Sequence, residues 1–380
     1  MNKLDELIER LCPNGVEYKA IGEVCTFQRG TSITSKDVIV GNIPVIAGGQ
    51  KPAYYHNTAN RTGETIVIAG SGAYAGYVSF WTNPIFLSDS FSVNPNKNIL
   101  IPKYVYYYLS NKQNDIYHMK RGSGVPHVYG SSIANFLIPI PPLEVQEEIV
   151  RILDSFTELT AELTAELTAR KKQYEYYRDT LLTFDENDTN VQRMTLGDIG
   201  KVSMCKRILK AETSLEEEVP FYKIGTFGKE PDAYISYDKY LEYKNKFSYP
   251  NKGEILISAA GTIGRTVIYN GEPAYYQDSN IVWLAHDESI ILNKYLYYYY
   301  QLQPWNIAKG GTIARLYNDN ISRAIILVPP LSEQERIVSI LDRFDALCND
   351  ISIGLPAEIA ARQKQYEYYR DKLLTFKKVP

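Results

Sequence analysis

The sequence is poor in the residues that build disulfide frameworks, metal centres and membrane spans. It contains 4 cysteines and 4 histidines in 380 residues, and no cysteine pair has the C-x-x-C spacing of a metal or redox site. No apolar run approaches the roughly 20 residues that a membrane helix needs, and the N-terminal segment lacks the apolar centre of a signal peptide. These absences favour a cytoplasmic protein without a membrane segment, a disulfide framework or a metal site.

Catalytic motifs are missing as well. The sequence has no P-loop, no [DNS]-P-P-[YF] loop of an amino-methyltransferase and no apparent PD…ExK nuclease cluster. The stretch GSGAYA at 70–75 does fit the dinucleotide pattern G-x-G-x-x-A, with Asp89 following 19 residues after Gly70. We interpret it as a hairpin turn, because the next segment, YVSFW, predicts a strand where a dinucleotide site needs a helix. An enzyme that binds a nucleotide at this turn remains an alternative.

What the sequence does contain is a tandem repeat. Near-identical segments recur in the same order, which indicates two copies of one structural unit. The matching segments are KQYEYYRD (172–179 and 364–371), IPPLEVQEEIVRILDSF (140–156) with VPPLSEQERIVSILDRF (328–344), and KYVYYYL (103–109) with KYLYYYY (294–300). Residues 25–62 and 200–252 hardly resemble each other, so the two copies share one task and differ in another.

The sequence of each copy predicts a β-rich region followed by helices. Short β-branched runs bounded by Gly and Asn predict the strands, and Tyr-rich segments predict helices whose rings mostly pack inside. The predicted strands are 64–69, 77–81, 254–259 and 265–269, and the predicted Tyr-rich helices are 102–113 and 293–303.

A long amphipathic helix closes each copy. The first is predicted from Glu144 to Phe184, about 60 Å at 1.5 Å per residue, with apolar residues at coiled-coil spacing. The second is predicted from Glu333 to Phe376, with an interruption at Gly354 and Pro356 because proline breaks a helix interior. Such helices need a partner, and each copy offers one to the other.

The expected fold is therefore α+β, with two β-rich domains joined by two long antiparallel coiled-coil helices in a pseudo-two-fold tandem repeat. Within the first helix, TELTAELTAEL at 157–167 repeats every four residues and contains Leu159, Leu163 and Leu167. Each four-residue unit adds about 6 Å of helix, so we interpret the ladder as a spacer whose length matters. The predicted domains are 1–143, 144–184, 185–331 and 332–380.

These segments carry a resemblance to a known family. PPLEVQEEIVRILD (141–154) and PPLSEQERIVSILD (329–342), each after a divergent domain, resemble the DNA-specificity subunits of type I restriction–modification systems. GEILISAAGTIG (253–264) is similar to that family's strand–turn–strand segment, whereas GETIVIAGSGAYAG (63–76) departs from it at the leucine.

The resemblance implies a non-catalytic subunit. Its two target-recognition domains would each read one half of a split, asymmetric site in double-stranded DNA, and its helices would act as a ruler. It would assemble with two methyltransferase subunits and, where present, restriction/translocase subunits. No membrane is expected among its partners. No cofactor is expected on this chain, and S-adenosylmethionine is expected on the methyltransferase. We expect Tyr174, Tyr177, Tyr366 and Tyr369 to serve the helix junction and methyltransferase docking.

Candidate DNA contacts lie in two polar, glycine-containing loops at matching places and in the divergent stretches. Lysine and backbone N–H groups suit phosphates, and arginine suits guanine. The candidates are Arg121, Ser123, His127 and Tyr129 in RGSGVPHVY (121–129), Lys309, Thr312 and Arg315 in KGGTIARLY (309–317), and Arg29, Lys51, Arg61, Arg207, Lys223 and Lys246 elsewhere.

Charge gives this assignment little support. Residues 1–143 carry 12 Lys and Arg against 9 Asp and Glu, but residues 185–331 carry 16 against 18. The second domain is therefore not basic, which argues against strong DNA affinity of the chain alone. A protein-interaction spacer, with end domains that bind peptide or carbohydrate in place of DNA, is the alternative from another class.

Overall fold

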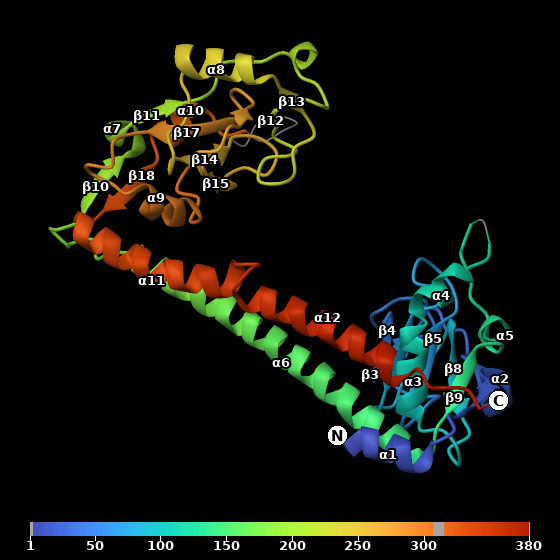
Figure 1. Ribbon diagram of the computed structural model, residues 1–380. Coiled ribbons are helices and arrows are strands. Elements are labelled where there is room, and N and C mark those ends of the chain that lie inside the picture. The colour runs from blue at the N-terminus through green and yellow to red at the C-terminus, as the bar shows by residue number, and fades with distance from the viewer. Residues whose placement is uncertain (1–2, 123, 307–314, 380) are drawn as a thin grey trace. The chain divides into compact units, whose positions relative to one another are not determined.

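The computed structural model describes residues 3–122, 124–306 and 315–379 (Figure 1). The chain folds into two compact units that each combine helices with sheets, as the predicted α+β class requires. Unit 1 comprises Met1–Thr164 and Glu358–Pro380, and unit 2 comprises Ala165–Ala357. The last segment of the chain thus belongs to the unit that holds the first.

A four-stranded antiparallel sheet forms the centre of unit 1, in the order β2-β8-β5-β6. Its inner strand β5 reads TIVIA and is buried along its whole length, since β-branched side chains pack well on a pleated surface. The strands of this sheet are β2 (Cys25–Arg29), β5 (Thr65–Ala69), β6 (Val78–Trp81) and β8 (Ser90–Pro95).

Two smaller sheets accompany it. A three-stranded sheet has the order β4-β3-β7, with β3 antiparallel to β4 and parallel to β7. A two-stranded ribbon pairs β1 with β9 and so joins the start of the domain to its end. The strands are β1 (Glu17–Ala20), β3 (Val40–Ile46), β4 (Tyr54–His56), β7 (Phe86–Leu87) and β9 (Leu137–Ile140).

Helices pack on the central sheet of unit 1 and share its hydrophobic core. Tyr104 and Tyr107 of α3 are among the largest fully buried side chains, which confirms the prediction that these tyrosines mostly pack inside. The short helices of unit 1 are α1 (Lys3–Leu11), α2 (Ile21–Val24), α3 (Pro102–Asn111), α4 (Gln113–His118) and α5 (Gly130–Ile133).

Unit 2 repeats this topology strand for strand. Its sheets have the orders β11-β17-β14-β15, β13-β12-β16 and β10-β18, which match the three sheets of unit 1. The strands are β10 (Gln192–Thr195), β11 (Lys201–Ser203), β12 (Val219–Tyr222), β13 (Tyr234–Ile235), β14 (Ile255–Ser258), β15 (Thr266–Ile268), β16 (Tyr275–Tyr276), β17 (Ile281–Ala285) and β18 (Ile325–Val328). The tandem repeat that the sequence predicts is confirmed.

The short helices of unit 2 follow part of the same plan and add two helices in the divergent stretch. In unit 2, α7, α9 and α10 occupy the chain positions of α2, α3 and α5, and α8 lies in the divergent stretch. Their bounds are α7 (Leu196–Ile199), α8 (Tyr237–Lys246), α9 (Asn293–Tyr300) and α10 (Asn318–Ser322), with a 3-10 helix η1 at Lys210–Glu212.

The two long helices differ in continuity. The first, α6 (Leu143–Leu181), is unbroken, whereas the second is split into α11 (Leu331–Asn349) and α12 (Leu355–Leu373), as predicted from Gly354 and Pro356. At the break, the carboxylate of Asp350 accepts hydrogen bonds from the backbone N–H groups of Ser352 and Ile353. Among the described residues, no helix is both long enough and apolar enough to cross a membrane.

The same aromatic junction occurs once in each unit. In unit 1, α12 runs antiparallel to α6 (Figure 1), and Phe156 stacks on Tyr369 with ring centroids 5.5 Å apart. In unit 2, Phe344 of α11 stacks on Tyr177 of α6 at 5.4 Å. Because Phe344 matches Phe156 and Tyr177 matches Tyr369 in the repeat, each unit joins the helix start of one copy to the KQYEYYRD segment of the other.

Buried glutamines explain the P-P-L-x-x-Q motif. The side chain of Gln146 accepts from the N–H of Ile101 at 2.9 Å and donates to the carbonyl oxygens of Ile99 and Pro141, both at 2.8 Å. Gln334 repeats these contacts in unit 2, with Leu292, Ile290 and Pro329. Each glutamine ties the first turn of a long helix to the segment before the Tyr-rich helix.

Further along each long helix, the carboxylate of an aspartate holds the Tyr-rich helix of the same unit. Asp154 of α6 accepts from the hydroxyl of Tyr107 and pairs with Lys103 at 2.8 Å. In unit 2, Asp342, Tyr298 and Lys294 form the same trio. These contacts fix each β-rich domain on its helix.

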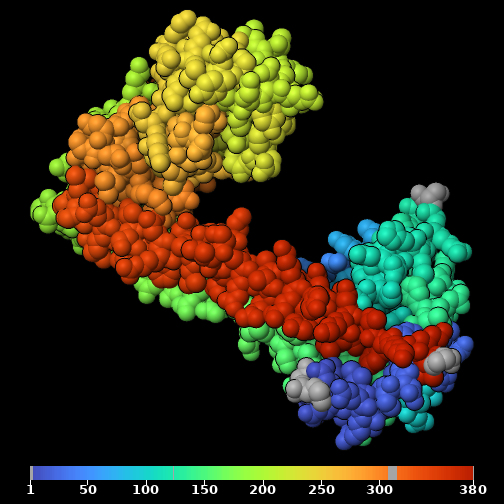
Figure 2. Space-filling model, in the orientation of Figure 1, coloured from blue at the N-terminus to red at the C-terminus, as the bar shows by residue number. Residues whose placement is uncertain are grey.

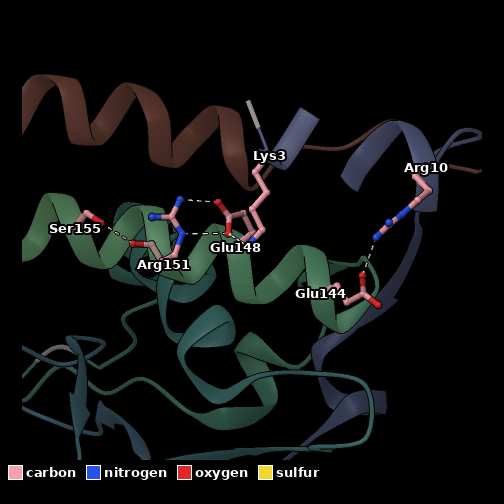
Figure 3. A network of polar contacts seen from close by, with 6 residues as sticks. All are labelled: Lys3, Arg10, Glu144, Glu148, Arg151 and Ser155. Carbon is pink, nitrogen blue, oxygen red and sulfur yellow. Dashed lines mark hydrogen bonds and ion pairs between the residues drawn. The ribbon is translucent and has the colours of Figure 1, made fainter. Parts of the chain in front are cut away.

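The N-terminal helix α1 is held on the start of α6 by ion pairs (Figure 3). Lys3 Nζ lies 2.8 Å from Glu148 Oε2, and Arg10 Nη2 lies 3.0 Å from Glu144 Oε2. Arg151 holds Glu148 Oε1 at 2.6 Å. The Glu148 side chain is 3% exposed, and hydrogen bonds from Arg151 and then Lys3 lower the pKa of its carboxyl to about 2.

The C-terminal segment lies against the start of the same unit, as the red and blue surfaces in Figure 2 show. The N–H of Val16 donates to the carbonyl oxygen of Lys377 at 2.8 Å, and the N–H of Val379 donates to that of Val16 at 3.1 Å. The hydroxyl of Tyr18 donates to the carbonyl oxygen of Phe376 at 2.8 Å.

Candidate nucleic-acid interface

The loop 121–129 of unit 1 packs on the turn between β5 and β6. The N–H of Val128 donates to the carbonyl oxygen of Gly70 at 2.9 Å, and the N–H of Gly72 donates to that of Pro126 at 3.0 Å. Arg121 and His127 exchange two backbone hydrogen bonds, of 3.0 and 2.8 Å, that close the loop. The turn itself joins two antiparallel strands, so the hairpin interpretation of GSGAYA is correct.

The last residues of the matching loop in the second copy, 315–317, meet their own hairpin in the same way. The N–H of Leu316 donates to the carbonyl oxygen of Ala259 at 2.8 Å, and Arg315 forms a β-bridge with Ala260, as His127 does with Ser71. His127 and Arg315 therefore occupy equivalent positions. Three candidate residues of these loops, Ser123, Lys309 and Thr312, lie outside the described residues.

A cavity of about 260 Å³, here called cleft 1, lies beside this loop in unit 1. Three predicted residues line it: Arg29 at the end of β2, His127 and Tyr129. The His127 and Tyr129 rings are nearly parallel, with centroids 6.1 Å apart. Arg121 lies outside cleft 1 and lines a neighbouring hollow of about 490 Å³ with Lys120.

Unit 2 has a larger cavity of about 550 Å³, here called cleft 2, between its divergent stretch and the segment that enters β17. Arg207 and Lys223 line it, and each is paired with a carboxylate, at 2.8 Å to Asp278 and 2.7 Å to Asp232. Arg315 does not line cleft 2, but its Nη2 donates to the carbonyl oxygen of Ser279, which does, at 3.0 Å. The cations of cleft 2 are thus largely neutralised within the protein.

The remaining candidates are not gathered at the clefts. Lys51 is exposed in the loop between β3 and β4, and Lys246 pairs with Glu242 at 3.0 Å on α8. Arg61 is held by hydrogen bonds inside unit 1. Its guanidinium donates to Ser92 Oγ and to the carbonyl oxygens of Gln28, Arg29 and Asn60, at 2.8 to 3.3 Å, and desolvation lowers its pKa.

The sequence reading missed most of the uncharged cleft residues. Cleft 2 also contains Gln277, Ser279 and Asn280, which lie just before β17, and cleft 1 contains Asp89 just before β8. A signal was present, since LSDSFSV (87–93) and YQDSNIVW (276–283) each contain an Asp-Ser pair near the start of a matching strand. Other cleft residues that were missed include Phe27, Gly130, Ser131, Lys210 and Asp278.

The helix residues proposed for spacing and docking are partly enclosed. Leu159, Leu163 and Leu167 are half-buried along α6. The hydroxyl of buried Tyr174 donates to Gln301 at 2.9 Å, and desolvation raises its pKa well above the ordinary value. Tyr366 packs against the core of unit 1. The tyrosines that face outward are Tyr176 and Tyr368, at 66% and 63% exposed.

The reactive side chains outside the clefts are structural. All four cysteines are buried, and burial raises the pKa of Cys25 and Cys205 to about 12, which suppresses the thiolate. His56 is buried and accepts from the N–H of Ile39 at 3.1 Å. Within the described residues, no three His, Cys, Asp or Glu side chains converge to hold a metal ion.

Comparison with known proteins points to one family. The family model "Type I restriction modification DNA specificity domain" matches residues 13–170 and 189–361. The chain is 46% identical to a putative type I restriction enzyme specificity subunit of Haemophilus influenzae, over 98% of each protein. It is 31% identical to the specificity subunit of the type I restriction enzymes EcoR124I and EcoR124II of Escherichia coli, over 100% of this chain and 98% of that one.

The fold agrees with that family. The structure is similar to that of an S subunit of a type I restriction–modification system from M. genitalium, with a TM-score of 0.62, 17% identity and coverage of 95% of this chain and 96% of that one. The chain therefore belongs to the type I restriction–modification DNA specificity family, whose members are non-catalytic subunits that recognise DNA sequence.

Proposed function

We propose that this chain reads a split, asymmetric DNA site, with cleft 1 on one half and cleft 2 on the other. The observation that carries this proposal is that each unit opens a cleft at the segment that enters the matching strand, β8 in unit 1 and β17 in unit 2. The other lining residues differ in origin, since those of cleft 1 come largely from the loop that packs on the hairpin and those of cleft 2 from the divergent stretch. Clefts at a matching point with different side chains suit two half-sites of different sequence. The recognition domains would be 1–143 and 185–331.

The contacts would divide into positioning and reading. Arg29, His127 and Tyr129 in cleft 1, and Arg207, Lys223 and Arg315 at cleft 2, stand where base edges can approach. Exposed Lys51 and Arg121 suit phosphates, which fix register without reading sequence. Ser123, Lys309, Thr312 and Lys246 remain candidates for backbone contact, whereas the bonds of Arg61 favour a structural role.

The internal ion pairs of cleft 2 bear on affinity. Phosphates that replaced Asp278 on Arg207, or Asp232 on Lys223, would have to break bonds of 2.8 and 2.7 Å. The net gain from such an exchange is small compared with the capture of phosphate by a free cation. Strong binding would therefore need partner subunits, which agrees with the charge balance of residues 185–331.

The helices, 144–184 and 332–380, would act as ruler and dock. The aromatic junction is built twice from matching residues, and each copy presents an outward tyrosine, Tyr176 or Tyr368. Two equivalent docking places suit two methyltransferase subunits, which would carry S-adenosylmethionine. The names of the curated relatives support a restriction enzyme complex as the setting, and we place that complex in the cytoplasm.

The test is a methylation map of DNA from cells that express the methyltransferase with or without this chain. The proposal predicts a split motif that appears only with the chain. A second strain lacks Thr164–Leu167, which removes about 6 Å of α6, so its spacer should shorten by one or two base pairs at about 3.4 Å per step. No chain-dependent motif, despite stable co-purification, would contradict the reading role.

A further inference from the structure

Counted back from the matching strands β8 and β17, Asp89 and Asn280 occupy the same position in the two copies, although the connection from the preceding strand is two residues longer in unit 2. The N–H of Gly70 donates to the carbonyl oxygen of Asp89 at 3.1 Å, and the N–H of Ala259 donates to that of Asn280 at 2.7 Å. The next residues confirm this register, since Ser90 pairs with Ala69 and Ile281 pairs with Ser258 at the entry to the matching strands.

Both residues line their clefts and are half-buried. One oxygen of Asp89 accepts from the hydroxyl of Ser71. Across the described ranges, the side chain of Asn280 makes no hydrogen bond with the protein. Each therefore has hydrogen-bonding capacity left for a ligand that enters the cleft.

The two side chains have nearly the same shape but form different hydrogen bonds. An ionised carboxylate only accepts hydrogen bonds, whereas a carboxamide both donates and accepts. In the major groove, a carboxylate suits the N4 amino group of cytosine, and a carboxamide suits adenine, whose N6 donates and whose N7 accepts. Exchanging a carboxylate for a carboxamide at one position of the fold would thus exchange the preferred base.

We propose that Asp89 and Asn280 determine specificity, with Asp89 selecting cytosine at one position of the first half-site and Asn280 selecting adenine at the equivalent position of the second. This inference rests on the proposed function, because it presumes that the clefts meet DNA. It explains in part how one repeated fold reads two different half-sites.

The neighbouring carboxylate of cleft 2 has a different task. Asp278 Oδ2 is paired with Arg207 at 2.8 Å, so this carboxylate is neutralised by a cation of the protein. It suits the positioning of Arg207, whereas the side chain of Asn280 has no protein partner across the described ranges.

The experiment uses the complete chain in complex with its methyltransferase. Asp89→Asn and Asn280→Asp are nearly isosteric, and circular dichroism establishes that each variant is folded. The methylation map of the wild type first gives both half-sites. Competition with duplexes that carry each of the four bases at each half-site position then gives the base preference of every variant.

The proposal predicts that Asp89→Asn shifts preference from cytosine toward adenine by about tenfold or more at one position of the first half-site. Asn280→Asp should shift preference from adenine toward cytosine at one position of the second. The control Asp115→Asn makes the same charge change on the exposed face of α4 and should keep every wild-type preference.

Wild-type preferences at all positions in folded Asp89→Asn and Asn280→Asp would overturn this inference and leave the proposed function standing. A wild-type complex without any split motif would instead overturn the proposed function. The two failures are therefore distinguishable in one series of measurements.

Discussion

Gln146 accepts a hydrogen bond from the backbone N–H of Ile101 at 2.9 Å, and its amide is fully buried. This contact ties the first turn of α6 to the strand-to-helix connection of unit 1. Gln334 makes the same contact with Leu292 in unit 2. The glutamine of the P-P-L-x-x-Q motif is therefore a structural joint between each β-rich domain and its helix.

Replacing Gln146 with alanine should destabilise unit 1. The change strands one buried N–H group and two buried carbonyl oxygens, and we expect a loss of about 2–4 kcal/mol in the free energy of unfolding. Urea denaturation followed by circular dichroism measures it. Gln334→Ala should behave alike, and Gln363→Ala, on the exposed face of α12, should change stability by less than about 0.5 kcal/mol. If Gln146→Ala lost no more unfolding free energy than Gln363→Ala, Gln146 would not be a structural joint.

Glu148 should make the stability of unit 1 sensitive to acid. Its folded-state pKa of about 2 lies below the ordinary 4.5, so between these values the unfolded chain binds more protons. The contribution is fully present above pH 4.5 and is lost as pH falls toward 2. In urea denaturation at a series of pH values, Glu148→Gln should flatten this dependence.

The matched control is Glu144→Gln, which also faces α1 but lies at a carboxylate that is 64% exposed. This variant should keep the loss of stability at acid pH that the wild type shows. If Glu148→Gln and Glu144→Gln gave the same pH profile, the buried ion pair with Lys3 and Arg151 would not be the source.

Alanine variants of Arg61 and Lys51 should distinguish a structural role from a role in DNA contact. Arg61→Ala removes the guanidinium donor from the carbonyl oxygens of Gln28, Arg29 and Asn60, and should lower the stability of unit 1 by about 2 kcal/mol. Lys51→Ala should leave stability unchanged and weaken DNA binding equally across sequences, with the salt dependence reduced by about one unit. Thermal melts and DNA titrations at several salt concentrations measure both effects. A reduced salt dependence for Arg61→Ala without loss of stability would reverse this assignment.

The repeat, the strand runs and the helix break could all be predicted from the sequence because they depend on local pattern. Proline breaks the interior of a helix, so Pro356 beside Gly354 marks the break in the second long helix. The position of Arg61 could not be predicted, because its partners Gln28 and Ser92 come from other strands. Likewise, the sequence singles out Asp89 only in the dinucleotide alternative, whereas its place in cleft 1 depends on the pairing of β5 with β8.

The outward tyrosines should carry methyltransferase docking. Tyr176 and Tyr368 are equivalent and exposed, whereas Tyr177 and Tyr369 stack on Phe344 and Phe156. We expect Tyr176→Ala to remove one methyltransferase from the assembly and the double variant with Tyr368→Ala to remove both. Mass measurement of the purified complex reports the stoichiometry, and circular dichroism checks the fold. Retention of two methyltransferases by the folded double variant would place docking elsewhere.

The most direct test of the central claim compares one variant from each cleft. Arg29→Ala changes cleft 1, and Arg207→Ala changes cleft 2, in the complete chain with its methyltransferase. We predict that the methylation map of Arg29→Ala relaxes or loses bases only in one half-site, and that of Arg207→Ala only in the other, with the spacer unchanged. Loss of specificity in the same half-site for both variants would contradict the assignment of one cleft to each half.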